Sequence, residues 1–322
     1  MKKYFLFIIL FSSEVVFGCL NYSVIGTDIH GKKISTEYSL RHNNAFYITE
    51  IDVENYRRMA SDDLKEYEKT KDIDRYLDYA TSLVYLGKYD KAIKIFKEIE
   101  LKNADKYEVF SNLGTAYELS GDNENALKYI SKALAINKES HHGSEWIHIK
   151  ILEYKLGRIT LENLLGSNFG NNEIPETKLS DEELDKFVED LSYQLSERTQ
   201  FVKPTNEIVG KLYFELGNAL ALHSNSDVEN TLEAYEFAKK YGYSNKLLEK
   251  RFTYFQNLVK QNPDSGKKIE GTDSVKVEKI LNENKNVTVT ASKSTSCSYW
   301  IIGGIAVLLS FILIFYLKKN KK

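Results

Sequence analysis

The chain has 322 residues, 42% of them hydrophobic, which is enough for a folded core and one membrane segment. Its formal net charge of -2 provides no overall field that would attract nucleic acid, so nucleic-acid binding is not expected. Only three prolines occur in the whole chain, and this scarcity predicts long helices with few interruptions.

The first 18 residues have the layout of a secretory signal peptide. Two lysines precede an apolar run from Tyr4 to Phe11, and a polar stretch then leads to the small residue Gly18. The run is shorter than the roughly 20 residues that span a bilayer. We therefore predict cleavage in front of Cys19. As an alternative, Cys19 carries a lipid, because "VFGC" resembles the sequence ahead of the lipidated cysteine of bacterial lipoproteins.

Residues 19–58 are rich in β-branched and aromatic side chains on either side of His30-Gly31. The stretches "YSVIGTDIHGKKIS" and "NAFYITEI" carry this composition. It favours a short hairpin or an extended arm. We expect this segment to pack on the first helices of the region that follows.

Residues 59–165 contain an internal repeat. The units 73–106 and 107–140 align without a gap at a shift of 34 residues, so that Gly87 falls on Gly121. In each unit, apolar residues recur at intervals of three and four, which is typical of amphipathic helices. The glycine lies between two such apolar stripes. Each unit therefore predicts two antiparallel helices joined by a turn at the glycine.

Small residues recur at equivalent places in both units. Ala80 aligns with Gly114 in the first helix, and Ala92 aligns with Ala126 in the second. Helices that cross about 8 to 10 Å apart need a small side chain where their backbones come closest. We therefore expect these four residues to mark the points where the paired helices cross.

The pattern of the second unit resembles the tetratricopeptide repeat family. The residues that carry the resemblance are Phe110, Leu113, Gly114, Tyr117, Gly121, Ala126, Ile130 and Ala133. Residues 73–106 match less fully, since Ile99 stands where a small residue is usual. The resemblance implies an all-α solenoid of antiparallel helix pairs. It also implies that the concave groove binds extended peptides or helices of partner proteins.

Further units are less regular. Residues 144–165 begin like a third unit with Gly157 at a turn, but its second helix is expected to be short. Residues 206–261 are interpreted as a fourth repeat and a closing helix. The insertion between them, 166–205, starts as a Gly- and Asn-rich loop and continues as a helix that extends the array or folds over its groove. Ser180 and Glu183 have the spacing of a capping box at the start of that helix.

The C-terminal part is different in composition. Residues 262–298 are poor in bulky apolar side chains, which predicts a flexible tether. Residues 299–317 carry no charge and, as a helix of about 29 Å, would span a bilayer. The basic residues 318–322 are expected to stay in the cytoplasm. This layout predicts a single-pass bacterial envelope protein with its repeats outside the cytoplasm, on the periplasmic face of the inner membrane.

The sequence has no Gly-rich phosphate loop, nucleophile elbow or HExxH motif. His141, His142 and His148 form the densest group of histidines, but they lack the spacing of a zinc site and are interpreted as polar residues at a helix start. Trp146 is interpreted as a core residue. We expect no catalytic activity, cofactor, metal or small-molecule substrate, and a role as a scaffold or adaptor that binds a protein or peptide.

Register within the repeats selects candidates for the partner-binding groove. They combine hydroxyl, amide and aromatic side chains with few cations, and they are Thr81, Val84, Tyr85, Ser111, Asn112, Thr115, Glu118, Lys211, Phe214 and Asn218. Two other functions remain open. One is an enzyme whose site joins His30, His42 and the acids of 181–190. The other is an extracytoplasmic sensor subunit of a membrane complex.

Overall fold

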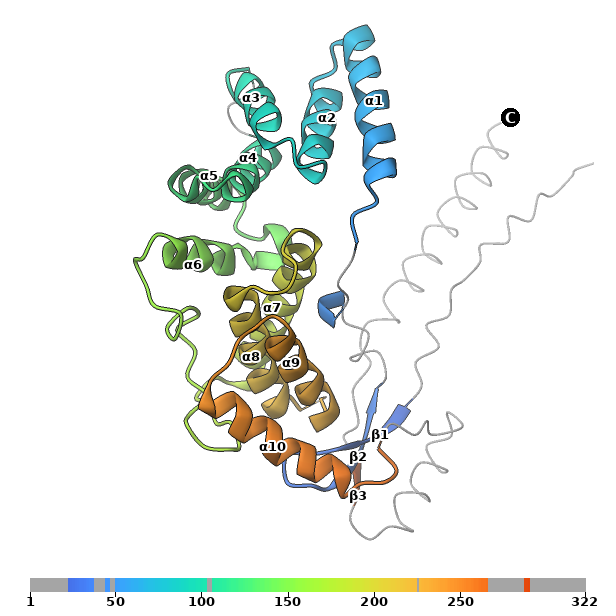
Figure 1. Ribbon diagram of the computed structural model, residues 1–322, viewed down its shortest axis with the longest axis vertical. Helices are drawn as coiled ribbons and strands as arrows, with labels where there is room; N and C mark the ends of the chain where they lie inside the picture. The colour runs from blue at the N-terminus through green and yellow to red at the C-terminus, as the bar shows by residue number, and fades with distance from the viewer. Residues whose placement is uncertain are drawn as a thin grey trace, which may run out of the picture.

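The computed structural model describes residues 23–37, 44–46, 50–102, 106–224, 226–265 and 287–289. Its helices follow one another along the long axis of the molecule, from α1–α3 at one end to α8–α10 and a small sheet at the other (Figure 1). We call the first end the front and the second the rear. The predicted helical repeat solenoid is confirmed, with a small sheet added to it.

The described helices and strands are α1 Val53–Thr70, α2 Ile73–Tyr85, α3 Tyr89–Glu100, α4 Tyr107–Ser120, α5 Asn123–Ile136, α6 Glu145–Lys155, α7 Asp181–Phe201, α8 Glu207–Leu222, α9 Val228–Lys240, α10 Lys246–Lys260, β1 Ser23–Thr27, β2 Lys33–Glu37 and β3 Val287–Val289. Two 3-10 helices, η2 (Asn44–Phe46) and η3 (Ser140–Gly143), are also present.

The two clear repeat units form the pairs α2–α3 and α4–α5. Gly87 and Gly121 lie in the turns with φ of 69° and 92°, a left-handed conformation that glycine adopts without strain. At the crossing of α4 and α5, a Cβ on Gly114 would come within 2.6 Å of Ile130 Cδ1. Ala92 and Ala126 are fully buried at the corresponding places. The predicted glycine turns and small-residue crossings are confirmed.

The third unit differs from the prediction. Helix α6 is present, but residues 156–180 contain no helix, so the expected short second helix was wrong. Gly157, Gly166 and Gly170 all have positive φ and interrupt any regular helical hydrogen bonding. The segment is nevertheless attached to the core, because the side chains of Leu164 and Phe169 are buried there.

Helix α7 follows this segment and packs against both α6 and α8. Its predicted capping box is confirmed: the backbone N–H of Glu183 donates to Ser180 Oγ, and Glu183 Oε2 accepts from the Ser180 N–H at 2.8 Å. Its apolar face packs against α8 and η2. At its other end, Phe201 packs against the core of the front repeats. The insertion therefore extends the array and also reaches over the front repeats.

The N-terminal hairpin is present but packs elsewhere than predicted. β1 and β2 pair as antiparallel strands, and Thr27 donates from its N–H and Oγ1 to Glu229 at 3.1 and 2.9 Å. Glu229 belongs to the rear helix α9, so the expected packing on the first repeat was wrong. The boundary at residue 58 was also wrong: α1 already begins at Val53, because the Asp52 side chain accepts from the Asn55 N–H and caps the helix.

Two described parts of the predicted tether 262–298, residues 262–265 and 287–289, are attached to the folded part of the chain. Asn262 is buried and donates from Nδ2 to Thr27 Oγ1 at 2.9 Å, and Lys33 forms an ion pair with Asp264. Strand β3 pairs in parallel with β2. The β-branched run Val-Thr-Val suits a strand, which explains why this part of the segment joins the sheet.

The predicted signal peptide 1–18, Cys19, the membrane-spanning helix 299–317 and the tail 318–322 lie outside the described residues. Within the described ranges, none of the helices has the length and apolar character needed to cross a membrane.

Candidate functional site

The structure corrects the rear part of the predicted groove. The exposed fractions of Lys211, Phe214 and Asn218 are 5%, 3% and 1%, so these side chains cannot line an open surface. Helix α10 and the turn before it cover them, and Tyr243 of that turn lies against both Lys211 and Phe214. Arg251 of α10 is fully buried and donates to Asn218 Oδ1 at 2.7 Å and to the Phe169 carbonyl at 2.6 Å. The prediction failed here because the repeat register shows which face is concave, and not what covers that face.

The chain's own N-terminal segment also packs on the rear helices. Phe46 of η2 lies against Tyr213 and Phe237, with ring centroids 6.3 and 5.7 Å away. The Tyr213 hydroxyl donates to the Ala45 carbonyl, and Ala45 is fully buried. The rear helices are thus occupied from within the chain.

At the front, four of the predicted residues are half-buried and in reach of a partner: Thr81, Tyr85, Asn112 and Thr115. Asn112 Nδ2 donates to Thr81 Oγ1 at 3.0 Å, which links the two repeat units. Val84, Ser111 and Glu118 are buried, so they support this surface from beneath and do not form it.

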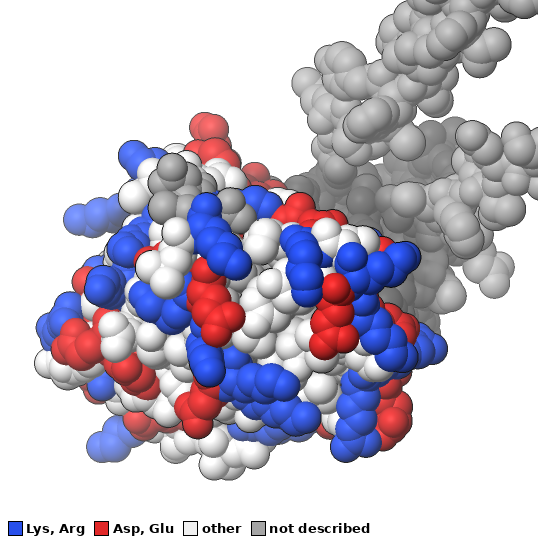
Figure 2. Space-filling view, turned by 90° about the horizontal axis from the view of Figure 1, so that it is seen from above, with Lys and Arg blue, Asp and Glu red and all other residues white. Residues whose placement is uncertain are grey.

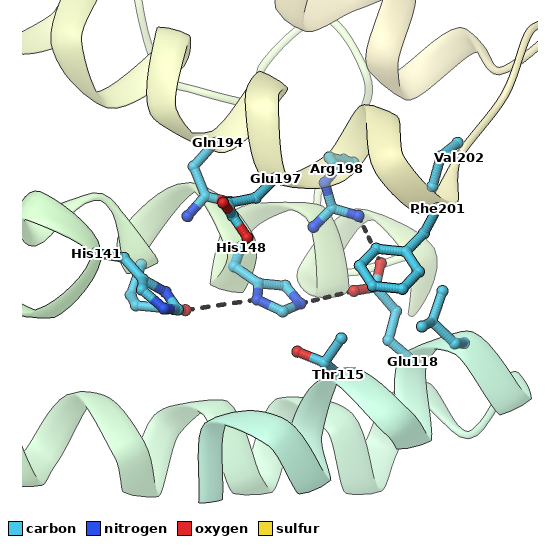
Figure 3. A pocket seen from close by; sticks show the side chains of 11 residues that line it. Thr115, Glu118, His141, His148, Gln194, Glu197, Arg198, Phe201 and Val202 are labelled. Carbon is cyan, nitrogen blue, oxygen red and sulfur yellow. Dashed lines mark hydrogen bonds and ion pairs between the residues drawn. The ribbon is translucent and has the colours of Figure 1, made fainter. Parts of the chain in front are cut away.

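A cavity of about 80 Å³ adjoins these residues, between α4, α6 and α7 (Figure 3). Thr115 and Leu119 line it from α4, and Glu197, Arg198 and Phe201 line it from α7. Water-sized groups need roughly 10–15 Å³ of such space each, so the cavity admits the end of one peptide side chain and no large ligand. We call this cavity and the half-buried residues beside it the front groove.

Its floor is a network of buried ion pairs centred on Glu118. Glu118 Oε1 accepts from Arg198 Nη1 at 2.8 Å and from Lys155 Nζ at 2.7 Å. Glu118 Oε2 lies 2.6 Å from His148 Nε2, whose other ring nitrogen lies 3.4 Å from Glu145 Oε2 (Figure 3). Helices α4, α6 and α7 are therefore joined by one polar network.

Electrostatics within the network favour the charged forms. Burial by itself would raise the pKa of Glu118, but Arg198, His148 and Lys155 hold it well below its usual range. Burial would likewise lower the pKa of His148, but the carboxylates of Glu118 and Glu145 raise it. His148 is thus favoured as a cation between two anions.

This network corrects the interpretation of the histidines as polar residues at a helix start. His148 is only 7% exposed and lies inside an interface between helices. His141 instead pairs with Glu145. The partners of Glu118 lie 30 and 80 residues away along the chain, at His148 and Arg198, and no local spacing could have revealed them.

Aromatic rings form one side of the front groove, and sequence reasoning missed two of them. Tyr56 of α1 stacks on Tyr85 with centroids 4.0 Å apart, and Phe201 of α7 lies 4.9 Å from Tyr85. Trp146 packs against the rear core, as predicted, and its Nε1 donates to Asp190 at 2.8 Å.

The described residues of the alternative enzyme site are not assembled. His30 is exposed in the β1–β2 turn and its backbone N–H is bonded to Asp28, while the acids of 181–190 lie on α7, where Asp185 pairs with His223 at 2.9 Å. His42 lies outside the described residues. In the part of the chain that the structure describes, no three His, Cys, Asp or Glu side chains are placed to hold a metal ion.

Acidic and basic side chains are interspersed on the front end of the molecule, in the view of Figure 2. No single sign of charge dominates the face shown there. Bulk attraction of a polyanion is therefore not indicated on this face.

Comparison with known proteins identifies the repeat. The profile of a family described as "Tetratricopeptide repeat" matches residues 107–140. No curated protein matches the chain. The crystal structure of BtubC (BKLC) from P. vanneervenii is similar at 13% identity and a TM-score of 0.32, over 65% of this chain and 87% of that chain. The TPR2AB-domain:pHSP90-complex of yeast Sti1 is similar at 18% identity and a TM-score of 0.26, over 65% and 77%.

Neither of those TM-scores indicates a shared overall shape, so the assignment depends on the profile match and the geometry of the repeats. The matched segment 107–140 forms the helix pair α4–α5, with Gly114 at the crossing and Gly121 at the turn. The preceding pair α2–α3 has the same arrangement. The chain is therefore a helical repeat protein whose residues 107–140 match the tetratricopeptide repeat family.

Proposed function

We propose that the chain is a non-enzymatic scaffold that holds a protein partner, as an extended peptide or a helix, in the front groove. Repeats of this family generally mediate protein–protein interaction, which supports the scaffold role. The observation that carries the location is the contrast in burial: Thr81, Tyr85, Asn112 and Thr115 are half-buried, while the equivalent side chains of α8 are covered. A partner therefore has access to the front repeats.

The second part of the proposal concerns the membrane. Residues 299–317 anchor the chain, and residues 19–298 lie outside the cytoplasm, on the periplasmic face. The support is the uncharged stretch followed by a basic tail. Strand β3 ends at Val289, ten residues before residue 299 (299 minus 289). Ten residues extend at most about 35 Å, so in this arrangement the rear sheet would lie within that distance of the membrane.

A photo-crosslinking experiment tests the groove. Tyr85 is replaced by the photoreactive residue p-benzoylphenylalanine, which keeps an aromatic ring on α2, and a control chain carries it at the exposed Lys94 of α3. We expect a discrete crosslinked protein, the same in repeated experiments, at position 85 and not at position 94. Identical products at both positions, or none at position 85, would contradict the groove.

A protease experiment tests the topology separately. Spheroplasts of the source cells, carrying the full chain with an epitope tag after Lys322, are treated with protease from outside. We expect the repeats to be digested while the tag is protected by the membrane. A digested tag with intact repeats would show the reverse orientation, and digestion of neither would place the repeats in the cytoplasm.

A further inference from the structure

One face of α7 presents a row of three residues toward the front groove. Tyr193, Glu197 and Phe201 are spaced four residues apart and so lie on the same side of the helix. Phe201 contacts Tyr85 of α2 at 4.9 Å between centroids. Tyr193 contacts the rings of His141 and His142 at 5.6 and 4.9 Å. The row therefore extends from the front repeats to the start of α6.

Glu197 stands in the middle of this row without a cation beside it. Its side chain is half-buried and lines the cavity, and among the described residues it has no ion pair or hydrogen bond (Figure 3). The nearby cations are already committed: Arg198 and Lys155 bind Glu118, and His141 binds Glu145. The groove thus holds one carboxylate whose charge is not balanced by a direct partner.

The carboxylate is within electrostatic reach of two tyrosines. Burial and the neighbouring Tyr56 raise the pKa of Tyr85, and the charge of Glu197 adds to that rise. Burial raises the pKa of Tyr193 as well, and Glu197 is the largest charge contribution to it. An anion among the faces and edges of aromatic rings is a poor environment for a second anion and a favourable one for a cation.

The geometry points to a partner of defined chemistry: the front groove takes a peptide segment with a lysine or arginine whose cationic head lies against Glu197, among the rings of Tyr85, Tyr193 and Phe201. The cation completes the ion pair that Glu197 lacks and gains cation–π attraction from the rings. An acidic side chain would meet an unpaired carboxylate there and is excluded by repulsion. This inference rests on the proposed function, since it names the partner's chemistry at the same groove.

Pools of synthetic peptides test the inference on the full chain in detergent micelles. Each pool contains fluorescently labelled 12-residue peptides, randomised among uncharged residues around one fixed central residue, which is Lys, Arg, Leu or Glu. Binding is measured by fluorescence polarisation. We expect the Lys and Arg pools to bind most tightly and the Glu pool most weakly.

Three variants locate the effect. Glu197→Gln is expected to weaken binding of the Lys pool about fivefold, while Glu236→Gln, which removes a carboxylate from the exposed face of α9, leaves it unchanged. Glu197→Lys is expected to reverse the preference from the Lys pool to the Glu pool. Circular dichroism shows whether each variant keeps the helix content of the parent chain.

The outcomes separate the inference from the function on which it rests. If the pools bind but show no preference for a basic residue, or if Glu197→Gln and Glu236→Gln have equal effects, the inference is overturned while the groove remains a binding site. If no pool binds the parent chain, the peptide groove fails and the inference fails with it. A reversal by Glu197→Lys supports both.

Discussion

The front pair α4–α5 and the rear pair α8–α9 are built alike and used differently. In each pair a glycine of the first helix lies where the second helix crosses: a Cβ on Gly114 would meet Ile130 at 2.6 Å, and one on Gly217 would meet Tyr235 at 2.5 Å. Yet 14 of the 16 residues of α8 are buried, whereas α4 keeps Asn112 and Thr115 half-buried on its inner side. The crossing geometry alone therefore does not make a binding surface.

The difference comes from what the rest of the chain places on each pair. The rear pair is covered by η2, by loop 156–180 and by α10, and it carries the N-terminal hairpin. The front pair packs on its neighbours α3 and α6, and the end of α7, with Arg198 and Phe201, closes one side of the groove and leaves a cavity. The rear is thus a stable base, and the front is the part that has surface left for a partner.

The largest loss of stability is expected when Arg251, which joins α10 to α8 and to loop 156–180, is replaced. Its guanidinium donates to Asn218 Oδ1 and to the carbonyls of Phe169, Gly170 and Asn172. Arg251→Ala leaves these buried acceptors unpaired, and we expect a loss of about 4 kcal/mol in the free energy of unfolding, measured with urea. The control Arg158→Ala removes an exposed ion pair with Glu124 and should cost less than about 1 kcal/mol. If the two variants lost the same free energy of unfolding, Arg251 would not be what stabilises the rear helices.

Phe46→Ala tests whether the rear helices depend on the chain's own N-terminal segment. Phe46 is 8% exposed and packs on Tyr213 and Phe237, so its removal should cost about 3 kcal/mol. Hydrogen exchange should become faster in α8 and α9 while α2–α5 keep their protection. If hydrogen exchange became faster to the same extent in all helices, the N-terminal segment would not stabilise the rear helices in particular.

The ion network between front and rear predicts a dependence on pH with two limits. The raised pKa of His148 means that its stabilisation is complete below its ordinary value of 6.5 and is lost as pH rises through the folded-state pKa. The lowered pKa values of Glu118 and Glu145 mean that their stabilisation is present above 4.5 and is lost as pH falls. The free energy of unfolding should therefore be greatest between about pH 4.5 and about pH 6.5.

Unfolding in urea from pH 4 to pH 9 measures this profile. One proton changes the free energy of unfolding by at most about 1.4 kcal/mol per pH unit. The variant His148→Gln keeps a polar side chain without a titrating ring. Its free energy of unfolding should therefore no longer fall above pH 6.5, while the loss of stability at acidic pH remains. If the variant still lost stability above pH 6.5, His148 would not be the group that causes this loss.

The smallest effect is expected at the start of α7. Ser180→Ala removes the side-chain oxygen that accepts from the Glu183 N–H, at a cost of about 1 kcal/mol. Ser196→Ala, in the same helix, removes only a bond to the Tyr193 carbonyl and serves as the control. If both changes had the same small effect, the cap would not be what fixes the start of this helix.

The parts of the fold that sequence predicted are those with short-range signals. The 34-residue period, the turns at Gly87 and Gly121 and the capping box at Ser180 each depend on residues a few positions apart. Helix register also selected Thr81, Tyr85, Asn112 and Thr115 as groove residues, and their side chains are half-buried. Helix periodicity and glycine's access to positive φ act locally, so they can be read without the fold.

The sequence by itself thus determined that helix pairs form, where they turn and which face of each points inward. Only the tertiary structure decided that the hairpin packs on the rear, and that Lys211, Phe214 and Asn218 are covered. It also decided that Glu118 pairs with His148 and Arg198, while Glu197 has no pair among the residues that the structure describes. Those outcomes depend on residues tens to hundreds of positions apart, and the burial of apolar area that brings such segments together is non-directional, so no spacing in the sequence records it.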